Sequence, residues 1–409
     1  ILKLTATLHN YDDMRLFMIT NCFLFSFLLF LVFPVSIHAQ SVPAAVSGLE
    51  NVTMIELDNP DEGNVTFGAP LLFSDENLIM GRIAGVAVDD KGQVYIADSD
   101  NTAIYQFDRN GNYLRSAGAA GDGPGEFRMI RSIEAGHGYL HVMDLSQRRI
   151  TRFSLDNLEF AGTVSMSGNQ EQMSGGFNMS RFPNQFLLMP DGNYLLTFSA
   201  MSFPGMGGSS NEEPKMAFDI LTPEGELLGL EGIELRSNET ITTASGGNFR
   251  IIMPPYGKKG LAVVTADGAI YTNWSEEALF KEYDTGGNYR QSLFIPYQKP
   301  PLNREELLAK TRETMDDASF ELFREQKFPA VWPAVNGMLP GDNGTLWISL
   351  NTRNQDENKW VVIDRKGHVK GTFLFPNERR IQRIKDGFIY TIEPDEDGFS
   401  SVKRYRINL

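Results

Sequence analysis

The fold of this chain is decided by two stretches that repeat each other 46 residues apart, Gly92-Gln93-Val94-Tyr95-Ile96-Ala97-Asp98 and Gly138-Tyr139-Leu140-His141-Val142-Met143-Asp144. The same offset relates the apolar runs that follow them, at residues 104–107 and 150–153. Such self-similarity at a fixed period indicates a repeat architecture. Each copy predicts a strand before the glycine turn, a second strand that ends in Asp, and a third strand. A fourth strand follows the turn Asp108-Arg109-Asn110-Gly111.

One four-stranded unit of this kind cannot bury both faces of its sheet alone, so it must stack on its neighbours, as the blades of a propeller do. Further turn glycines, each followed by an apolar strand, mark four more units: Gly192, Gly268, Gly344 and Gly387. Glycine at these positions supplies the positive φ that a tight hairpin needs. We therefore predict an all-β fold, a six-bladed β-propeller of four-stranded antiparallel blades.

The turn spacing also gives approximate boundaries for the blades. The sixth blade ends the chain one strand short, and a strand near the N-terminus, at about residues 65–73, is expected to complete it and close the ring. The six blades together make up residues 40–409, with blades expected at about 83–118, 129–166, 182–234, 249–297, 328–376 and 377–409.

A short helical insertion is predicted between blades four and five, at residues 303–327. Asn303 can cap a helix that has Glu306 at its third position, and Leu308, Met315 and Phe323 recur near helical spacing. The helix is expected either to cover a blade edge or to act as a lid over the axial funnel.

One motif carries a resemblance to a known family. The run Gly121-Asp122-Gly123-Pro124-Gly125-Glu126-Phe127 is followed by a turn, an apolar strand ending in Asp, and Gln147-Arg148-Arg149-Ile150-Thr151-Arg152-Phe153. This pattern resembles the repeat of NHL-type propellers, and the chain more widely resembles secreted bacterial six-bladed propellers related to the NHL and TolB-like groups. The resemblance implies a fold and no single activity, because such propellers include binding scaffolds, lyases and lactonases.

The composition fits a folded, acidic domain. Hydrophobic residues make up 42% of the chain, with 28 Phe and 13 Tyr, which is ample material for a core. The formal net charge is −15. A surface this acidic repels phosphate backbones and anionic lipid head groups, so neither nucleic acid nor a membrane surface is an expected partner.

Residues 14–39 are typical of a secretory signal peptide. Arg15 lies in a short basic segment, residues 23–33 are almost wholly apolar, and Ala39 is the small residue expected before the cleavage point. We expect an exported protein, periplasmic or extracellular, with no stable membrane span after leader cleavage; an uncleaved N-terminal anchor is the alternative.

Two further expectations concern this N-terminal part. Residues 1–13 begin without Met and are polar, so we interpret them as an upstream extension before the true start. Cys22, the only cysteine, lies inside the apolar stretch. A lipid-anchored cysteine should end that stretch instead, so neither a lipid nor a disulfide is expected in the mature chain.

Polar residues end the second strand of each predicted blade, and these strand ends should lie on one face of the ring: Asp98, Asp144, Ser199, Asn273, Asn351 and Glu393. In the gluconolactonase-like enzymes among the propellers that the chain resembles, carboxylates and amides near that face hold a divalent metal. The resemblance thus makes four residues candidate ligands for calcium or another divalent metal: Asp98, Asp144, Asn273 and Glu393. The alternative is that these side chains cap the backbone amides of the following turn.

Arginines recur where the chain enters the first strand of a blade. Arg82 and Arg128 share the 46-residue register, and Arg181 and Arg250 occupy comparable positions. Equivalent side chains should point toward the same end of the channel, where guanidinium groups suit planar carboxylates or sulfates. These four arginines are therefore the candidate ligand-binding residues, and structural ion pairs with nearby carboxylates are the alternative.

The sequence thus predicts an exported propeller that acts as a ligand-binding or protein-interaction scaffold. Its partner is an unknown small molecule, glycan or protein, with an anionic saccharide or carboxylate at the central funnel as the leading candidate. No residue has a catalytic signature, no cofactor is firmly implied, and the histidines outside the leader are too scattered for a zinc site. The alternative is a metal-dependent lactonase or lyase of the gluconolactonase-like type.

Overall fold

A computed structural model describes residues 44–57, 65–166, 182–199, 213–245, 248–395 and 398–409. The predicted leader and upstream extension lie outside the described residues. The chain divides into two compact units, residues 1–47 and 48–409. The described part of the first unit contains the short 3-10 helix η1 (Ala44–Val46), and the second unit contains all the described sheets.

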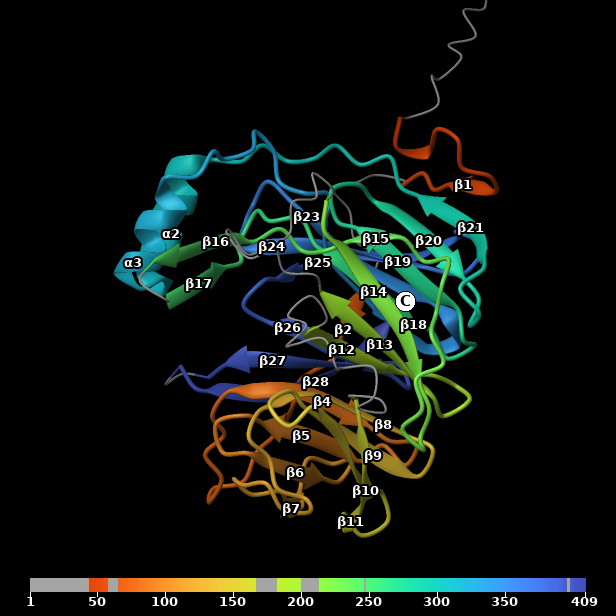
Figure 1. Cartoon of the computed structure of the whole chain (residues 1–409), viewed down its shortest axis with the longest axis vertical. Coiled ribbons are helices and arrows are strands. Elements are labelled where there is room, and N and C mark those ends of the chain that lie inside the picture. The colour runs from red at the N-terminus through yellow and green to blue at the C-terminus, as the bar shows by residue number, and fades with distance from the viewer. Residues whose placement is uncertain (1–43, 58–64, 167–181, 200–212, 246–247, 396–397) are drawn as a thin grey trace, which may run out of the picture. The chain divides into compact units, whose positions relative to one another are not determined.

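The second unit is a six-bladed β-propeller, so the predicted fold class is confirmed (Figure 1). The strands of blade one are β4 (Ile83–Val88), β5 (Val94–Asp98), β6 (Ala103–Phe107) and β7 (Tyr113–Ala117). Those of blade two are β8 (Ile130–Gly136), β9 (Tyr139–Asp144), β10 (Arg149–Ser154) and β11 (Phe160–Ser165). Those of blade three are β12 (Phe182–Leu188), β13 (Tyr194–Ser199), β14 (Lys215–Leu221) and β15 (Leu235–Arg236).

The second half of the ring follows the same order. In two of its blades, strands from the start of the second unit are added at the outer edge. Blade four consists of β18 (Gly260–Val264), β19 (Ile270–Trp274), β20 (Leu279–Tyr283) and β21 (Tyr289–Phe294), to which β1 (Val52–Met54) is added. Blade five consists of β22 (Val335–Pro340), β23 (Leu346–Asn351), β24 (Glu357–Ile363) and β25 (Val369–Pro376). Blade six consists of β26 (Arg380–Lys385), β27 (Phe388–Pro394) and β28 (Ser400–Asn408), with β2 (Thr66–Phe67) and β3 (Leu71–Phe73) beside β28.

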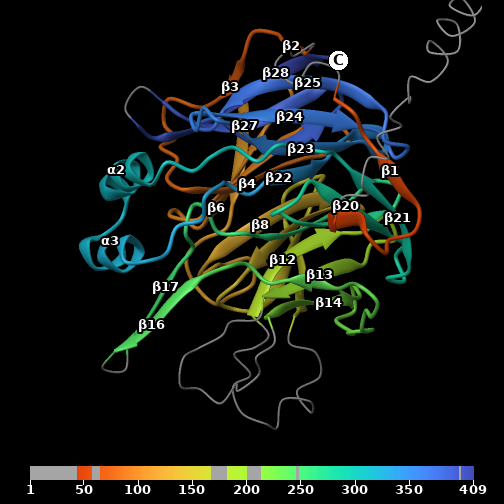
Figure 2. The same cartoon turned by 90° about the horizontal axis from the view of Figure 1, so that it is seen from above.

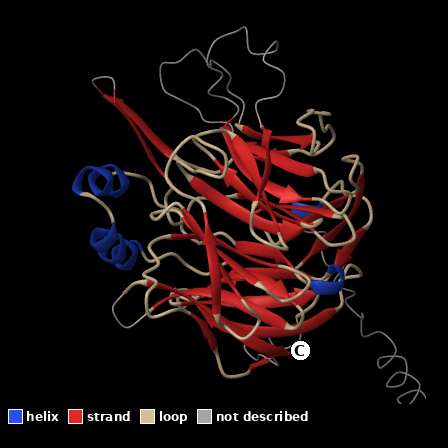
Figure 3. Cartoon of the chain, turned by 90° about the horizontal axis from the view of Figure 1, so that it is seen from below, coloured by secondary structure: helices blue, strands red, loops and turns tan. Residues whose placement is uncertain are grey.

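The six innermost strands form a closed ring around the axis. Each contacts the innermost strand of the next blade, in the order β4, β8, β12, β18, β22 and β26, and β26 contacts β4 again. Figure 3 shows that strands make up most of this unit. Since every innermost strand runs in the same sense along the axis, the ends of all six meet at one face of the ring.

The hydrophobic core is divided among the blade interfaces. Six clusters of buried side chains lie one at each interface between neighbouring blades. In β5, Val94 and Ile96 belong to the interface with blade six, whereas Tyr95 and Ala97 belong to the interface with blade two. Alternate residues of a strand point to opposite faces of its sheet, so a strand between two blades is buried along its whole length. This explains why the second strands read as continuous apolar runs.

Strands near the start of the second unit run along the edges of the later blades. β3 pairs antiparallel with β28, and Phe73 opposite Val402 is fully buried. β1 pairs in parallel with β21 of blade four. Between these two, the backbone N–H of Val65 donates to the carbonyl of Thr372 in blade five at 3.4 Å. Residues 52–73 thus reach three consecutive blades, and the fourth strand of blade six comes from residues 71–73.

Blade four differs from its predicted bounds. Its first strand begins at Gly260, not near residue 249, because β17 (Asn248–Ile252) pairs with β16 (Ile241–Ser245) in a separate hairpin. Figure 2 shows this hairpin beside helices α2 (Arg304–Thr314) and α3 (Asp317–Arg324), away from the sheets of the blades.

The predicted insertion after blade four is helical, but it contains two helices instead of one. Asn303 caps α2 through Oδ1, which accepts from the backbone N–H of Glu305 at 3.1 Å and of Glu306 at 3.3 Å. Asp316 caps α3 by accepting from the N–H of Ser319 at 3.1 Å, and its extended backbone interrupts the helix. An N-cap residue has non-helical backbone angles, so a second cap within the segment divides it. None of the helices in the described ranges is long and apolar enough to cross a membrane.

The two helices pack on segments that lead into innermost strands. Leu307 and Phe323 form a buried cluster with Tyr256, which precedes β18, and Trp332, which precedes β22. These contacts lie where innermost strands begin. The helices therefore lie near the starts of β18 and β22, beside the β16–β17 hairpin.

Candidate functional site

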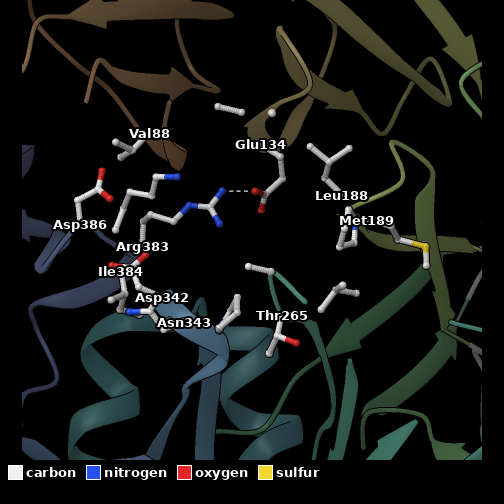
Figure 4. Close-up of a pocket in the computed structure, with 18 of the residues that line it drawn as sticks. Val88, Glu134, Leu188, Met189, Thr265, Asp342, Asn343, Arg383, Ile384 and Asp386 are labelled. Carbon is white, nitrogen blue, oxygen red and sulfur yellow. Dashed lines mark hydrogen bonds and ion pairs between the residues drawn. The ribbon is translucent and has the colours of Figure 1, made fainter. Parts of the chain in front are cut away.

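A cavity of about 580 Å³ lies on the axis where the innermost strands end (Figure 4). All six blades contribute to its wall, each through the last residues of its innermost strand or the turn that follows. Charged and hydrogen-bonding side chains among its lining residues are Glu134, His137, Thr265, Asp342, Asn343, Arg383, Lys385 and Asp386. The volume is within the range of small-molecule sites in proteins.

An ion pair between Glu134 of β8 and Arg383 of β26 forms part of this wall (Figure 4). The two strands flank β4, so the pair joins blades two and six across blade one. Ala87, Glu134 and Arg383 hold equivalent places in their blades, since they lie opposite Tyr95, His141 and Tyr390 of the second strands. The methyl group of Ala87 leaves room for the two long side chains to meet.

The Glu134–Arg383 pair is accessible from the cavity without being fully hydrated. The side chain of Glu134 is 24% exposed and that of Arg383 is 19% exposed. An ion pair on the open surface is worth little, whereas a fully buried one is costly to separate. The exposure of this pair lies between these extremes. A ligand can therefore reach both charges, and its contacts with them are stronger than they would be in open solvent.

Further polar contacts join the blades at the rim of the cavity. Lys385 donates to Asp90 at 2.7 Å, which links blades six and one. The backbone N–H of Gly387 donates to Asp342 at 3.3 Å, which links blades six and five. Nε2 of His137 lies 3.0 Å from the carbonyl oxygen of Met189 and therefore donates to it, linking blades two and three.

The opposite part of the wall is apolar. Blades three and four supply Leu188, Met189, Pro190, Val264 and Ala266, together with one polar side chain, Thr265, whose hydroxyl donates to Asp267 at 2.5 Å. Figure 4 places Leu188 and Met189 on the other side of the cavity from Arg383 and Asp386. The cavity therefore offers charged groups on one side and an apolar surface on the other.

The four candidate metal ligands are not brought together. Asp98 accepts from the backbone N–H of Gly81 at 2.7 Å and of Asn101 at 3.0 Å, and Asp144 accepts from the N–H of Arg128 at 2.7 Å. The bond from Asn101, and the bond that Asp144 accepts from the N–H of Gln147 at 2.9 Å, are the capping role given above as the alternative; the bonds from Gly81 and Arg128 hold the segments before the first strands. Among the residues that the structure describes, no three His, Cys, Asp or Glu side chains are grouped so as to hold a metal ion.

The other two candidate ligands also make local bonds. Nδ2 of Asn273 donates to the carbonyls of Glu277 at 2.8 Å and Leu279 at 2.9 Å. Glu393 is buried, which opposes its charged form, but hydrogen bonds from Thr391 and Tyr405 and the ammonium of Lys403 hold the pKa of Glu393 below its usual value.

Three of the candidate arginines have carboxylate partners, and none of these three lines the cavity. Arg82 pairs with Asp100 at 3.2 Å, Nε of Arg128 donates to Asp122 at 2.5 Å, and Arg250 pairs with Asp316 at 2.8 Å. Arg181 lies outside the described residues. Because Arg82 and Arg128 each lie six residues before the first lining residue of their strand, Val88 and Glu134, roughly 20 Å of strand at about 3.3 Å per residue separates them from the cavity.

Arg82 and Arg128 are also not equivalent, which corrects the assumed register. Asp98 accepts from the N–H of Gly81, whereas Asp144 accepts from that of Arg128, so Arg128 corresponds to Gly81. In blade one the carbonyl of Arg82 accepts from the N–H of Ser99. In blade two the carbonyl of Met129 accepts from the N–H of Leu145, so Arg82 corresponds to Met129. The innermost strands are thus offset by 47 residues, and a one-residue slip turns side chains to opposite faces.

The glycine-rich motif of the NHL-like resemblance is a folded loop at the start of blade two. Glu126 accepts from the N–H of Gly123 at 2.8 Å, and Nε2 of Gln147 donates to the carbonyl of Gly121 at 2.6 Å. Arg149 donates to the carbonyl of Gly123 at 2.9 Å. The Gln-Arg-Arg run therefore holds the glycine-rich run in place, which explains why the two occur together.

Sequence reasoning did not single out Glu134 or Arg383. The available signal was a charge at a position that is apolar in other blades: with the 47-residue offset, Glu134 takes the place of Ala87. The second and third strands are offset by 46 residues, and applying that offset to the innermost strands aligns Glu134 with Val88 instead of Ala87.

Comparisons with known proteins agree with the fold. The DUF5128 family model, described as a 6-bladed beta-propeller, matches residues 65–174. The chain is thus a six-bladed β-propeller, as its NHL-like resemblance implied. No curated protein sequence matches it.

Solved structures with a similar fold include three bacterial proteins. A "Putative exported protein" from Bacteroides fragilis is 12% identical, with 88% of this chain and 100% of that chain covered and a TM-score of 0.49. A DUF4221 member from Bacteroides vulgatus is 11% identical, with 85% and 99% covered and a TM-score of 0.49. A gluconolactonase from Xanthomonas campestris is 12% identical, with 85% and 90% covered and a TM-score of 0.44. Identities and TM-scores this low assign no activity to this chain.

Proposed function

We propose that this protein is a binding propeller that holds a small ligand in the axial cavity at the ends of its innermost strands. The observation that supports this proposal best is the Glu134–Arg383 pair. Two opposite charges occupy a position that is Leu187, Val263 or Leu339 in other blades, and they meet in a cavity large enough for a ligand. Stability alone does not require a charged pair there, because apolar side chains fill the same position elsewhere in the ring.

The lining favours a ligand that is neutral as a whole over a simple anion. Three carboxylates and two permanent cations line the cavity, and each cation already has an acidic partner. An anion such as a uronate would meet this excess of negative charge, which opposes its binding. The ligand therefore carries donors and acceptors together, and an apolar part that contacts the wall of blades three and four.

The place of action follows from the predicted leader. Residues 14–39 support export, and we propose that the ligand is met in the periplasm or outside the cell. The alternative function, a metal-dependent lactonase or lyase, stays a prediction from the resemblance, because its candidate ligands each make local bonds in separate blades.

A binding screen with a matched pair of variants tests this proposal. Saccharides, uronates, small carboxylates and amino acids are titrated at millimolar concentration by calorimetry into the wild type, Arg383→Gln and Arg128→Gln. Arg128 is the control because it also pairs with a carboxylate, Asp122, but lies at the other end of the innermost strands. We expect at least one class to bind, with affinity reduced about tenfold or more by Arg383→Gln and unchanged by Arg128→Gln.

Two outcomes would overturn the proposal. One is binding that Arg128→Gln abolishes and Arg383→Gln leaves intact, which would place the ligand at the arginines first suggested by the sequence. The other is the absence of binding by every class in the screen.

A further inference from the structure

The chemistry of the axial cavity points to a narrower class of ligand. This inference rests on the proposed function, because it concerns the same cavity. Its starting point is that Glu134 and Arg383, an acidic and a basic group of the cavity wall, are bonded to each other. Only Nη2 of Arg383 takes part in this bond, so its other N–H groups stay available, but a ligand that takes the place of either partner must separate the pair.

Separating the pair is favourable only for a ligand that satisfies both charges. A carboxylate ligand that took the place of Glu134 on Arg383 would leave Glu134 as a partly buried charge without a partner. A cationic ligand that took the place of Arg383 on Glu134 would leave Arg383 without a partner. An unpaired charge in a partly desolvated site is strongly unfavourable. A ligand with an ammonium and a carboxylate exchanges one ion pair for two charge-assisted contacts and leaves no charge unpaired.

The geometry also limits how far apart the two ligand charges are. The Glu134 carboxylate and the Arg383 guanidinium are in direct contact, so a ligand needs to move them apart by little if its own charges lie on neighbouring atoms. An α-amino acid meets this condition, since its ammonium and carboxylate are attached to one carbon. A zwitterion with distant charges would require the two innermost strands to separate.

The apolar wall defines the rest of the ligand. Leu188, Pro190 and Ala266 lie on the side of the cavity that carries no charge. A charged or strongly polar ligand side chain would lose its hydration against this surface without gaining a partner, whereas an apolar one gains from burial.

We propose that the axial cavity binds a free α-amino acid with an apolar side chain, its ammonium on Glu134, its carboxylate on Arg383 and its side chain against blades three and four. Leucine is a suitable probe. N-acetylleucine keeps the carboxylate but lacks the positive charge, and leucinamide keeps the ammonium but lacks the negative charge.

The test compares these three probes by calorimetry, slightly below neutral pH so that the amine of leucinamide is protonated. In the wild type, leucine should bind about tenfold or more tightly than either blocked probe, since each has lost one charge-assisted contact. In Glu134→Gln, N-acetylleucine should bind as well as leucine. In Arg383→Gln, leucinamide should bind as well as leucine. The double variant should lose the preference for the zwitterion, and Arg128→Gln should behave as the wild type.

The outcomes separate this inference from the proposed function. Equal affinity of the wild type for leucine and N-acetylleucine would overturn the zwitterion inference. So would binding of a saccharide that depends on Arg383 with no binding of leucine, and that result would leave the proposed function standing. If no probe and no compound of the wider screen binds, both fail. Thermal unfolding of each variant shows whether it is folded, and the exchange of preference between the two single variants cannot result from unfolding.

Discussion

At the scale of single residues, the buried polar groups of the second strands show how tightly side-chain identity is linked to position. Tyr95, His141, Tyr271 and Tyr390 lie at equivalent places and are all buried. A buried polar group needs a hydrogen-bond partner. Tyr271 donates to Glu282 at 2.9 Å, and Nδ1 of His141 lies 3.0 Å from the hydroxyl of Tyr194 in the next blade.

His141 should make the stability of the protein depend on pH. Burial, chiefly, lowers the pKa of His141 to about 4 from an ordinary value near 6.5. Because its pKa is lower in the folded state, the stabilisation is fully present above about pH 6.5 and is lost as the pH falls toward 4, by about 3 kcal/mol at most. His141→Gln cannot be protonated, so urea unfolding of this variant should lose less stability between about pH 7 and pH 4.5 than the wild type does.

A pH dependence of the free energy of unfolding that is the same in His141→Gln and in the wild type would show that His141 is not the group responsible.

At the scale of elements, the sequence predicted the strands better than their relative registers. The glycine turns and apolar runs identify the second and third strands of each blade, because those strands are buried on both faces and keep a strict spacing. The innermost strands of blades one and two each contain a bulge, between Ile83 and Gly85 and between Ile130 and Ser132, but the turn between β8 and β9, counted between equivalent paired residues, is one residue shorter than that between β4 and β5. A shift of one residue in a loop has no signature in composition, so the equivalence of Arg82 and Arg128 was wrong.

The same reasoning explains the remaining differences. A hairpin before blade four has the alternation of a blade strand, and only its pairing with β16 shows that β17 is not the first strand. The Glu134–Arg383 pair depends on β8 and β26 lying on either side of β4, which the order of the blades predicts. It also depends on the register of β8, which the 46-residue offset obscures.

The closing element β3 gives a prediction with a control in the same strand. Phe73 is fully buried against blade six, whereas the adjacent Leu72 is 46% exposed. Phe73→Ala should lower the free energy of unfolding by about 3–5 kcal/mol, as large-to-small changes in a core do. Leu72→Ala should change it by about 0.5 kcal/mol, as surface changes do. Equal effects of the two variants in urea unfolding would contradict the observed pairing of β3 with β28.

At the scale of the whole second unit, residues 52–73 tie blades four, five and six together along their edges. A chain that begins at Gly48 retains these strands, whereas one that begins at Glu76 lacks them and exposes the edge of β28. Unpaired strand edges associate with other chains. We expect the first chain to unfold in one cooperative transition at the temperature of the full chain, and the second to aggregate or melt far lower.

Light scattering during a thermal scan distinguishes these cases. An unchanged melting temperature for the chain that begins at Glu76 would show that the ring does not need its N-terminal strands.

The position of β28 between β27 and β3 also has a consequence for biosynthesis. Asn408 bonds to Thr66, 342 positions earlier, so the pairing that completes blade six joins strands made early to one made much later. A nascent chain emerges at roughly 5–20 residues per second, and its early strands have no permanent partner during that time. Five blades can assemble in order as they appear, but β2 and β3 must wait unpaired until β28 has been made.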